Sequence, residues 1–137
     1  MPLTEAQLAA LRALVNRIIP PDDFPGGWEA GAGDYLLRQL AGDLAPLRAA
    51  YAAGLSALDA EAQAAGAANF AAMPAEAQDA LLMQVEAGRV AAEWPIDPAE
   101  FFRNAVTHTA EGYYSDPGNG GNRGGVAWQM LGYLVKE

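Results

Sequence analysis

The chain has 137 residues, of which 52% are hydrophobic and 18% are charged. This length supports one hydrophobic core but not two ordinary domains, so residues 1–137 are expected to form a single domain. The formal net charge of −9 disfavours binding to nucleic-acid phosphates or to anionic lipid surfaces. Because the sequence has no cysteine, disulfides, thiolate metal sites and cysteine nucleophiles are excluded.

The first predicted helix covers about residues 4–19. Thr4 and Gln7 have the spacing of a capping box, and four apolar residues follow at intervals of three and four: Leu8, Leu11, Val15 and Ile18. Pro20 and Pro21 end this helix, because a proline disfavours helical geometry in the residue before it and cannot donate a backbone hydrogen bond.

A loop with several glycines follows over residues 22–33 and contains Trp28. A tryptophan in such a loop either covers the core or anchors an interface with another protein. We favour the interface, because Gly26 and Gly27 beside it are expected to expose the backbone.

Three more helices are predicted in the middle of the chain, from apolar spacing: residues 33–40, about twenty residues from Leu44 onward, and residues 74–88. Gly42 closes the first of these helices and Gly66 breaks the second. Between the second and third, Phe70 is expected to point into the core.

A fifth helix is predicted from Asp97 to about Tyr113, because Asp97 supplies a cap, Pro98 suits a first turn, and Glu100 is an acid in that turn. Its apolar face is predicted to consist of Phe101, Phe102, Ala105, Val106 and Thr109. No segment alternates apolar and polar residues for long, and β-branched residues are few. We therefore predict an all-α fold of five to six helices with a long Gly-rich C-terminal loop; residues 126–135 fit either a helix or an extended segment.

The Gly-rich stretch at residues 112–125 is GYYSDPGNGGNRGG, with six glycines in fourteen residues. Glycine lets the backbone adopt positive φ or lie against a surface that a Cβ would strike. Tyrosine, asparagine and arginine alternate with the glycines, which is unusual in a flexible linker and typical of a recognition surface. The predicted partner interface consists of Trp28, His108, Glu111, Tyr113, Tyr114, Asp116, Asn119, Gly120, Gly121, Asn122, Arg123 and Trp128.

The sequence offers few candidate sites of chemistry. His108, the only histidine, and Glu111 have the i, i+3 spacing used by di-iron helical bundles, but such sites need two of these pairs and further carboxylates. A histidine hydrogen-bonded to a nearby carboxylate or backbone carbonyl is therefore the preferred interpretation. The spacing of the acids does not fit a calcium loop, and no dinucleotide-binding glycine motif follows a strand. No catalytic residue, metal ligand or cofactor-binding residue is predicted in this chain.

Three segments of the sequence carry a resemblance to a known family. Residues 108–133, HTAEGYYSDPGNGGNRGGVAWQMLGY, resemble the C-terminal signature of the gluconate 2-dehydrogenase subunit 3 family. Residues 11–36 resemble its opening, in which a helix ends in an Ile-Pro step and a Gly-rich turn leads to the next helix, and residues 70–88 extend the similarity. The resemblance covers nearly the whole chain, and the glycine signature is its most specific part.

The resemblance implies a small accessory subunit of a flavin-dependent sugar or polyol dehydrogenase. Its partner would be a large catalytic subunit of the glucose-methanol-choline oxidoreductase type that holds the FAD, and a cytochrome subunit could also belong to the complex. The accessory chain would stabilise the large subunit and help it to fold, as a chaperone does. Many family members begin with a twin-arginine export signal, which this N-terminus lacks. The expected location is therefore the cytoplasm, or the periplasm if a signal has been removed or the complex is exported.

Two other functions stay open at this stage. A free-standing enzyme would need a pocket lined by His108, Glu111 and Asp116, and would turn over a sugar without a flavoprotein. A stand-alone binding module would show saturable affinity for a small molecule without a large subunit.

Overall fold

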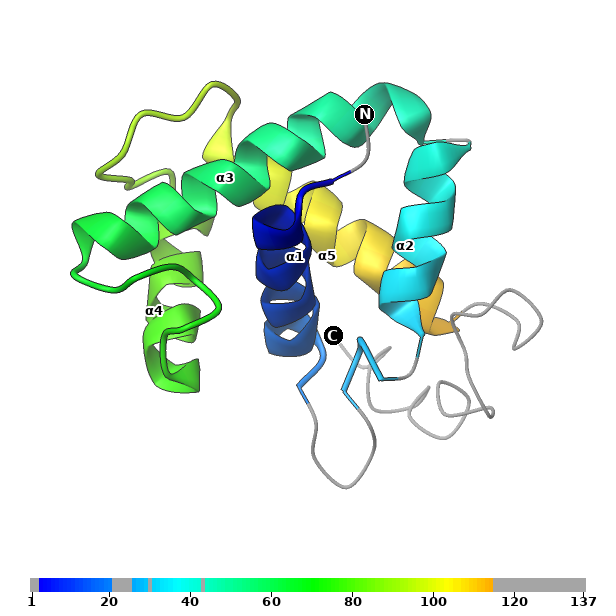
Figure 1. Cartoon of the computed structure of the whole chain (residues 1–137), viewed down its shortest axis with the longest axis horizontal. Helices are drawn as coiled ribbons and strands as arrows, with labels where there is room; N and C mark the ends of the chain where they lie inside the picture. The colour runs from blue at the N-terminus through cyan, green and yellow to red at the C-terminus, as the bar shows by residue number, and fades with distance from the viewer. Residues whose placement is uncertain (1–2, 21–25, 30, 43, 115–137) are drawn as a thin grey trace.

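A computed structural model describes residues 3–20, 26–29, 31–42 and 44–114, and these residues form a helical assembly (Figure 1). Its elements in chain order are α1 (Glu5–Ile18), α2 (Ala32–Ala41), the 3₁₀ turn η1 (Ala45–Leu47), α3 (Arg48–Ala64), α4 (Ala75–Glu86) and α5 (Pro98–Tyr114). No strand occurs in these ranges. The predicted all-α class and the five predicted helices are confirmed.

Helix boundaries follow the capping signals in the sequence. At the start of α1, Gln7 N donates to Thr4 Oγ1 and Thr4 N donates to Gln7 Oε1, which completes the predicted capping box. At the start of α5, Asp97 Oδ1 accepts from the backbone N–H groups of Ala99 and Glu100. Gly42 caps the end of α2, as predicted.

The start of the third predicted helix differs from expectation. Residues 45–47 form a 3₁₀ turn, and the α-helix begins only at Arg48. Pro46 sits in this short turn, and neither η1 nor α3 has a side-chain cap at its N-terminus. The tighter 3₁₀ geometry is common where a helix begins without such a cap.

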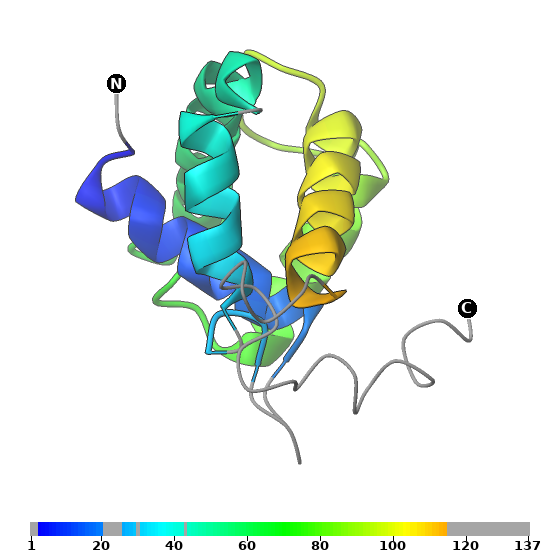
Figure 2. The same ribbon diagram turned by 90° about the vertical axis from the view of Figure 1, so that its right-hand side faces the viewer.

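Helix α5 is the common packing partner of the fold. It packs against α1, α2, α3 and α4, most extensively against α2 and α4. Figure 2 shows α2 and α5 running side by side, and Figure 1 shows α3 crossing above α1 with α5 behind them. The shared core includes Leu11, Leu36, Leu55, Phe70 and Phe101. Phe70 is fully buried, as predicted.

The face by which α5 joins the core differs from the predicted one. Phe101, Ala105 and Thr109 are buried, as predicted, but Phe102 is only half-buried and Val106 is exposed. The buried stripe continues instead through His108 and Gly112. The prediction for Val106 was wrong because apolar residues form two neighbouring stripes on this helix, and only one of them meets α2 and α3.

Two helix crossings depend on glycine. A Cβ added at Gly54 in α3 would overlap the ring of Phe101 in α5, and one added at Gly112 in α5 would lie 2.8 Å from Cδ2 of Tyr35 in α2. Cβ atoms do not approach other heavy atoms so closely. Both positions therefore require glycine, which has no Cβ. Gly112 was predicted to begin a recognition surface; in the structure it packs inside the chain.

Candidate functional site

Most of the predicted partner interface lies outside the described residues. This applies to Asp116, Asn119, Gly120, Gly121, Asn122, Arg123 and Trp128, and the side chain of Tyr114 is also outside the description. Trp28, His108, Glu111 and Tyr113 are the predicted interface residues whose surroundings the structure gives.

Trp28 is half-buried and packs against the core. Its ring lies over Gly33 of α2, where a Cβ would strike it, and its backbone N–H donates to Asn16 Oδ1 at 3.0 Å. Gly26 and Gly27 are buried, so the argument that they expose the backbone beside Trp28 was wrong. The ring covers part of the core, and its contact with a partner stays a prediction.

His108 is 9% exposed and lies against Tyr51 of α3. The Tyr51 hydroxyl is 2.6 Å from His108 Nδ1 and 3.3 Å from the backbone oxygen of Asn104. Both contacts are hydrogen bonds at once if Nδ1 carries a proton and donates to the hydroxyl, which then donates to Asn104. The expected carboxylate or carbonyl partner of His108 is thus replaced by a tyrosine from another helix.

Burial raises the pKa of Tyr51 well above its ordinary value of 10.0, and the negative charge of Glu111 raises it further. Glu111 itself is exposed. Within the described residues, no three side chains of the histidine, cysteine or acidic types gather into a group able to hold a metal ion. The contact between Tyr51 and His108 joins α3 to α5, and Glu111 acts on Tyr51 through its charge.

Tyr113 is fully buried. Its ring is part of the interior of this chain, rather than the exposed aromatic area that the sequence suggested. Direct contact between Tyr113 and a partner stays a prediction.

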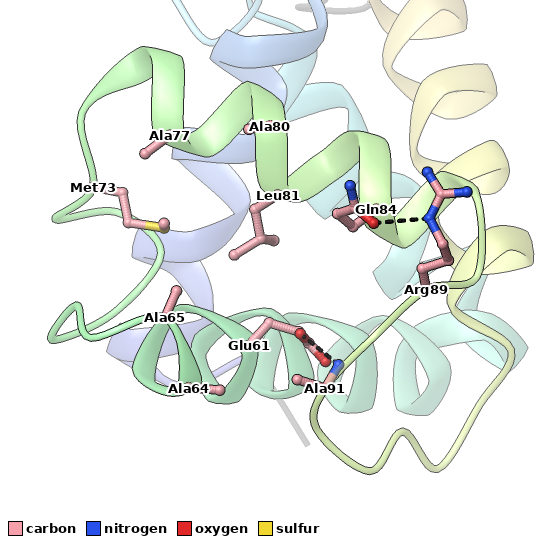
Figure 3. A pocket seen from close by; sticks show the side chains of 10 residues that line it. All are labelled: Glu61, Ala64, Ala65, Met73, Ala77, Ala80, Leu81, Gln84, Arg89 and Ala91. Carbon is pink, nitrogen blue, oxygen red and sulfur yellow. Dashed lines mark hydrogen bonds between the residues drawn. The ribbon is translucent and has the colours of Figure 1, made fainter.

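An open groove lies between α3 and α4, with a volume of about 490 Å³ (Figure 3). Apolar side chains line most of it, five of them from alanines, with Met73 at one end and Arg89 at the other, as Figure 3 shows. We call it the α3–α4 groove; its lining residues are Glu61, Ala64, Ala65, Met73, Ala77, Ala80, Leu81, Gln84, Arg89 and Ala91.

Glu61 of α3 fixes the loop at one end of the α3–α4 groove. Its carboxylate accepts from the backbone N–H groups of Ala91 (3.0 Å) and Ala92 (2.7 Å) and from the indole Nε1–H of Trp94 (3.0 Å). Burial by itself would raise the pKa of Glu61, but these three hydrogen bonds outweigh it and hold the pKa below the ordinary value.

The loop at the other end is fixed through Phe70. The backbone N–H of Phe70 donates to Asp59 Oδ1 of α3 at 3.0 Å, and its carbonyl accepts from Gln78 Nε2 of α4 at 2.9 Å. Gln78 is buried. Side chains from both helices thus hold the backbone that closes the groove near Met73.

The comparison with protein families decides the identity of the chain. The model of the family described as gluconate 2-dehydrogenase subunit 3 matches residues 5–133. The chain belongs to this family. The match includes every helix from α1 to α5 and continues through the Gly-rich segment. No curated protein and no solved structure matched the chain in the two other comparisons.

Membership of the gluconate 2-dehydrogenase subunit 3 family makes the chain an accessory subunit of a dehydrogenase complex. A larger assembly is therefore its working state, and surfaces able to receive another protein become the relevant sites. None of the helices in the described ranges is long and apolar enough to cross a membrane.

Sequence reasoning missed the α3–α4 groove and Glu61. The alanines of α3 and α4 give no sign in the sequence that the two helices stay apart. Glu61 lies on the buried face of α3, four residues after Ala57 and three after Leu58, and an acid at a core position is a signal that it has hydrogen-bond partners.

Proposed function

We propose that this chain is the non-catalytic small subunit of an FAD-dependent sugar or polyol dehydrogenase whose large subunit is of the glucose-methanol-choline type. The small subunit binds the native large subunit, stabilises it and assists its folding. FAD and the substrate chemistry belong to the large subunit, and a cytochrome subunit is a further candidate member of the complex.

The family match over residues 5–133 is the observation that carries this proposal, because it identifies the chain as a subunit of a dehydrogenase. The sequence supports the division of roles. It contains no dinucleotide-binding glycine motif after a strand and no cysteine for haem attachment. A chain that binds only the native state of its partner shifts the partner's folding equilibrium by mass action, and one that covers apolar surface reduces aggregation during folding.

Co-expression with the flavoprotein subunit of the same genome tests the proposal. We expect the two chains to co-purify, and the large subunit to be obtained in higher soluble yield and with a higher melting temperature than when it is expressed alone. The absorbance spectrum of the complex should contain the flavin bands, whereas the small chain purified by itself should be colourless.

The small chain expressed alone is the control in this experiment. A flavin or haem spectrum from it, or turnover of a sugar by it, would contradict the accessory role. If the large subunit is equally soluble and equally stable without the small chain, the small chain does not stabilise it.

A further inference from the structure

We propose that the α3–α4 groove binds one amphipathic helix of the large dehydrogenase subunit, with apolar side chains against the alanine walls and a carboxylate at Arg89. This inference rests on the proposed function, because it names the surface by which the accessory subunit would hold its partner. Four observations support it: the shape of the groove, its rigidity, its charge and its openness.

The shape arises because α3 and α4 do not pack on each other. Both helices pack against α1 and α5, yet they make scarcely any direct contact with one another. Alanines 64, 77 and 80 line the gap, and Leu81 points into it between the two helices (Figure 3). Small side chains let a third helix approach closely, and its larger side chains would occupy the space of about 490 Å³.

The groove is rigid before any partner arrives. Glu61 fastens the loop at its Arg89 end with three hydrogen bonds, and Asp59 and Gln78 fasten the loop at its Met73 end. Binding to a surface that is already ordered avoids the entropic cost of fixing side chains and loops. Both fastenings hold backbone, so the ends of the groove keep their positions.

Arg89 gives the groove its charge preference. Its Nε donates to Gln84 Oε1 at 3.0 Å, which leaves the terminal guanidinium nitrogens available, and no acid in the described part of the chain pairs with it. The carboxylate of Glu61 at the same end already accepts three hydrogen bonds. In a chain of net charge −9, an arginine without an acidic partner beside an apolar groove matches an occupant that carries its own carboxylate.

The openness of the groove favours a protein segment over a small molecule. Ala64, Ala65, Ala80, Gln84 and Arg89 are all exposed, so a ligand lying there would keep one side in water. Small-molecule sites usually bury about 70–90% of their ligand. An amphipathic helix needs only one buried face, and its apolar residues at i, i+3 and i+4 fit a long groove between two helices.

Filling the groove is the first test. Ala80 is exposed and lines the groove, so Ala80→Trp should leave the melting temperature of the isolated chain nearly unchanged. It should weaken binding to the purified large subunit by about tenfold or more, since a bulky ring would occupy the place of the partner helix. Ala9→Trp, on an exposed position of α1 away from the groove, is the matched control and should change the Kd by less than about twofold.

Charge reversal is the second test. Arg89→Glu should raise the Kd for the large subunit by about tenfold. The Kd of the wild type should rise with salt concentration, and this rise should be smaller for Arg89→Glu. Arg103→Glu makes the same change at an exposed position of α5 and should leave the Kd within about twofold of the wild type. If Ala80→Trp and Arg89→Glu both bind like the wild type, the groove proposal is overturned while the accessory function stands.

Cross-linking identifies the occupant. Because the chain has no cysteine, Ala80→Cys carrying a maleimide photo-crosslinker places one reactive group in the groove. Attachment to a helix of the large subunit in the co-purified complex supports the proposal. Attachment to a second copy of this chain, or to residues 115–137 of the same chain, overturns it. A wild-type chain that binds no dehydrogenase subunit overturns both the groove proposal and the proposed function.

Discussion

The carboxylate of Glu61 receives all its hydrogen bonds from one loop, which makes a single residue responsible for the position of residues 91–94. Its pKa in the folded chain lies below the ordinary value of 4.5, so the folded state favours the ionised carboxylate. A carboxyl group whose pKa is lower in the folded chain than in the unfolded chain stabilises the folded state at pH values above its pKa in the unfolded chain. That contribution disappears as the pH falls through the lower, folded-state pKa.

Glu61→Gln should therefore lower the melting temperature at pH 7 and make the melting temperature depend less on pH. An amide nitrogen cannot accept a hydrogen bond, so at least one of the three partly buried N–H groups would lose its acceptor, at a cost of about 1 kcal/mol. Melting temperatures between pH 7 and pH 3 measure the effect. The difference between wild type and variant should narrow below about pH 4.5.

Glu93→Gln is the control for this comparison, because Glu93 is exposed in the same loop. It should melt like the wild type at every pH. Parallel pH profiles for the wild type and Glu61→Gln would show that the ionised carboxylate does not hold the loop.

The residue scale is also where sequence reasoning was weakest. The spacing of His108 and Glu111 indicated a possible pair on one face of a helix, but the group that reaches His108 is the Tyr51 hydroxyl, 57 positions earlier in the chain. Nothing in the local sequence specifies which helix will lie opposite. The same is true of Glu61, whose donors lie 30 to 33 positions later.

At the scale of elements, the sequence predicted much more. Helix starts at Thr4 and Asp97 followed from local hydrogen-bonding chemistry that involves only neighbouring residues. How the helices cross one another could not be predicted. In the sequence, a glycine within a helix is only a residue of low helix propensity, and nothing indicates that another helix approaches it closely. Only the structure shows that Gly54 admits the ring of Phe101, and that Gly112 admits Tyr35.

Gly54→Ala tests the crossing of α3 and α5. Alanine has the higher helix propensity by about 1 kcal/mol, so an exposed site would gain stability from this change. Here the added Cβ overlaps the Phe101 ring, and we expect a net loss of about 1 to 3 kcal/mol in the free energy of unfolding, measured by urea denaturation.

A double-mutant cycle supplies the check on this explanation. Phe101→Leu creates room opposite position 54, so Gly54→Ala should cost clearly less in that background than in the wild type. Strict additivity of the two changes would mean that the destabilisation has a cause other than the ring contact.

At the scale of the whole molecule, the predicted interface and the described structure overlap little. Tyr113 is buried and Trp28 covers part of the core, and the Gly-rich residues that carry most of the prediction lie outside the described ranges. The family and its subunit role could be inferred from sequence because the glycine signature is specific. The α3–α4 groove could not, since it depends on which faces the helices leave uncovered.

Gly121→Val and Arg123→Ala test the part of the interface predicted from sequence alone. If glycine at position 121 brings backbone against a partner, Gly121→Val should leave the melting temperature of the isolated chain almost unchanged and weaken the complex. Arg123→Ala should cost roughly 2 kcal/mol or more in binding if a desolvated partner group is lost. Thermal melts and pull-downs against the large subunit measure both effects.

The alternative outcomes are distinct. Gly121→Val would destabilise the lone chain by about 1 to 3 kcal/mol if the glycine run packed on its own helices at positive φ. If both variants bind the large subunit as tightly as the wild-type chain does, the Gly-rich stretch is not part of the docking surface.

The central position of α5 also determines when the protein becomes able to fold. Among the helices that the structure describes, the one that packs against the other four is synthesised last, so α1 to α4 are made before their common partner exists. At about 5 to 20 residues per second, the 28 residues that follow Glu86, up to and including Tyr114, take about 1 to 6 seconds to make. During that interval the apolar faces that α5 later covers lack their packing partner, and the core can close only after translation has passed residue 114.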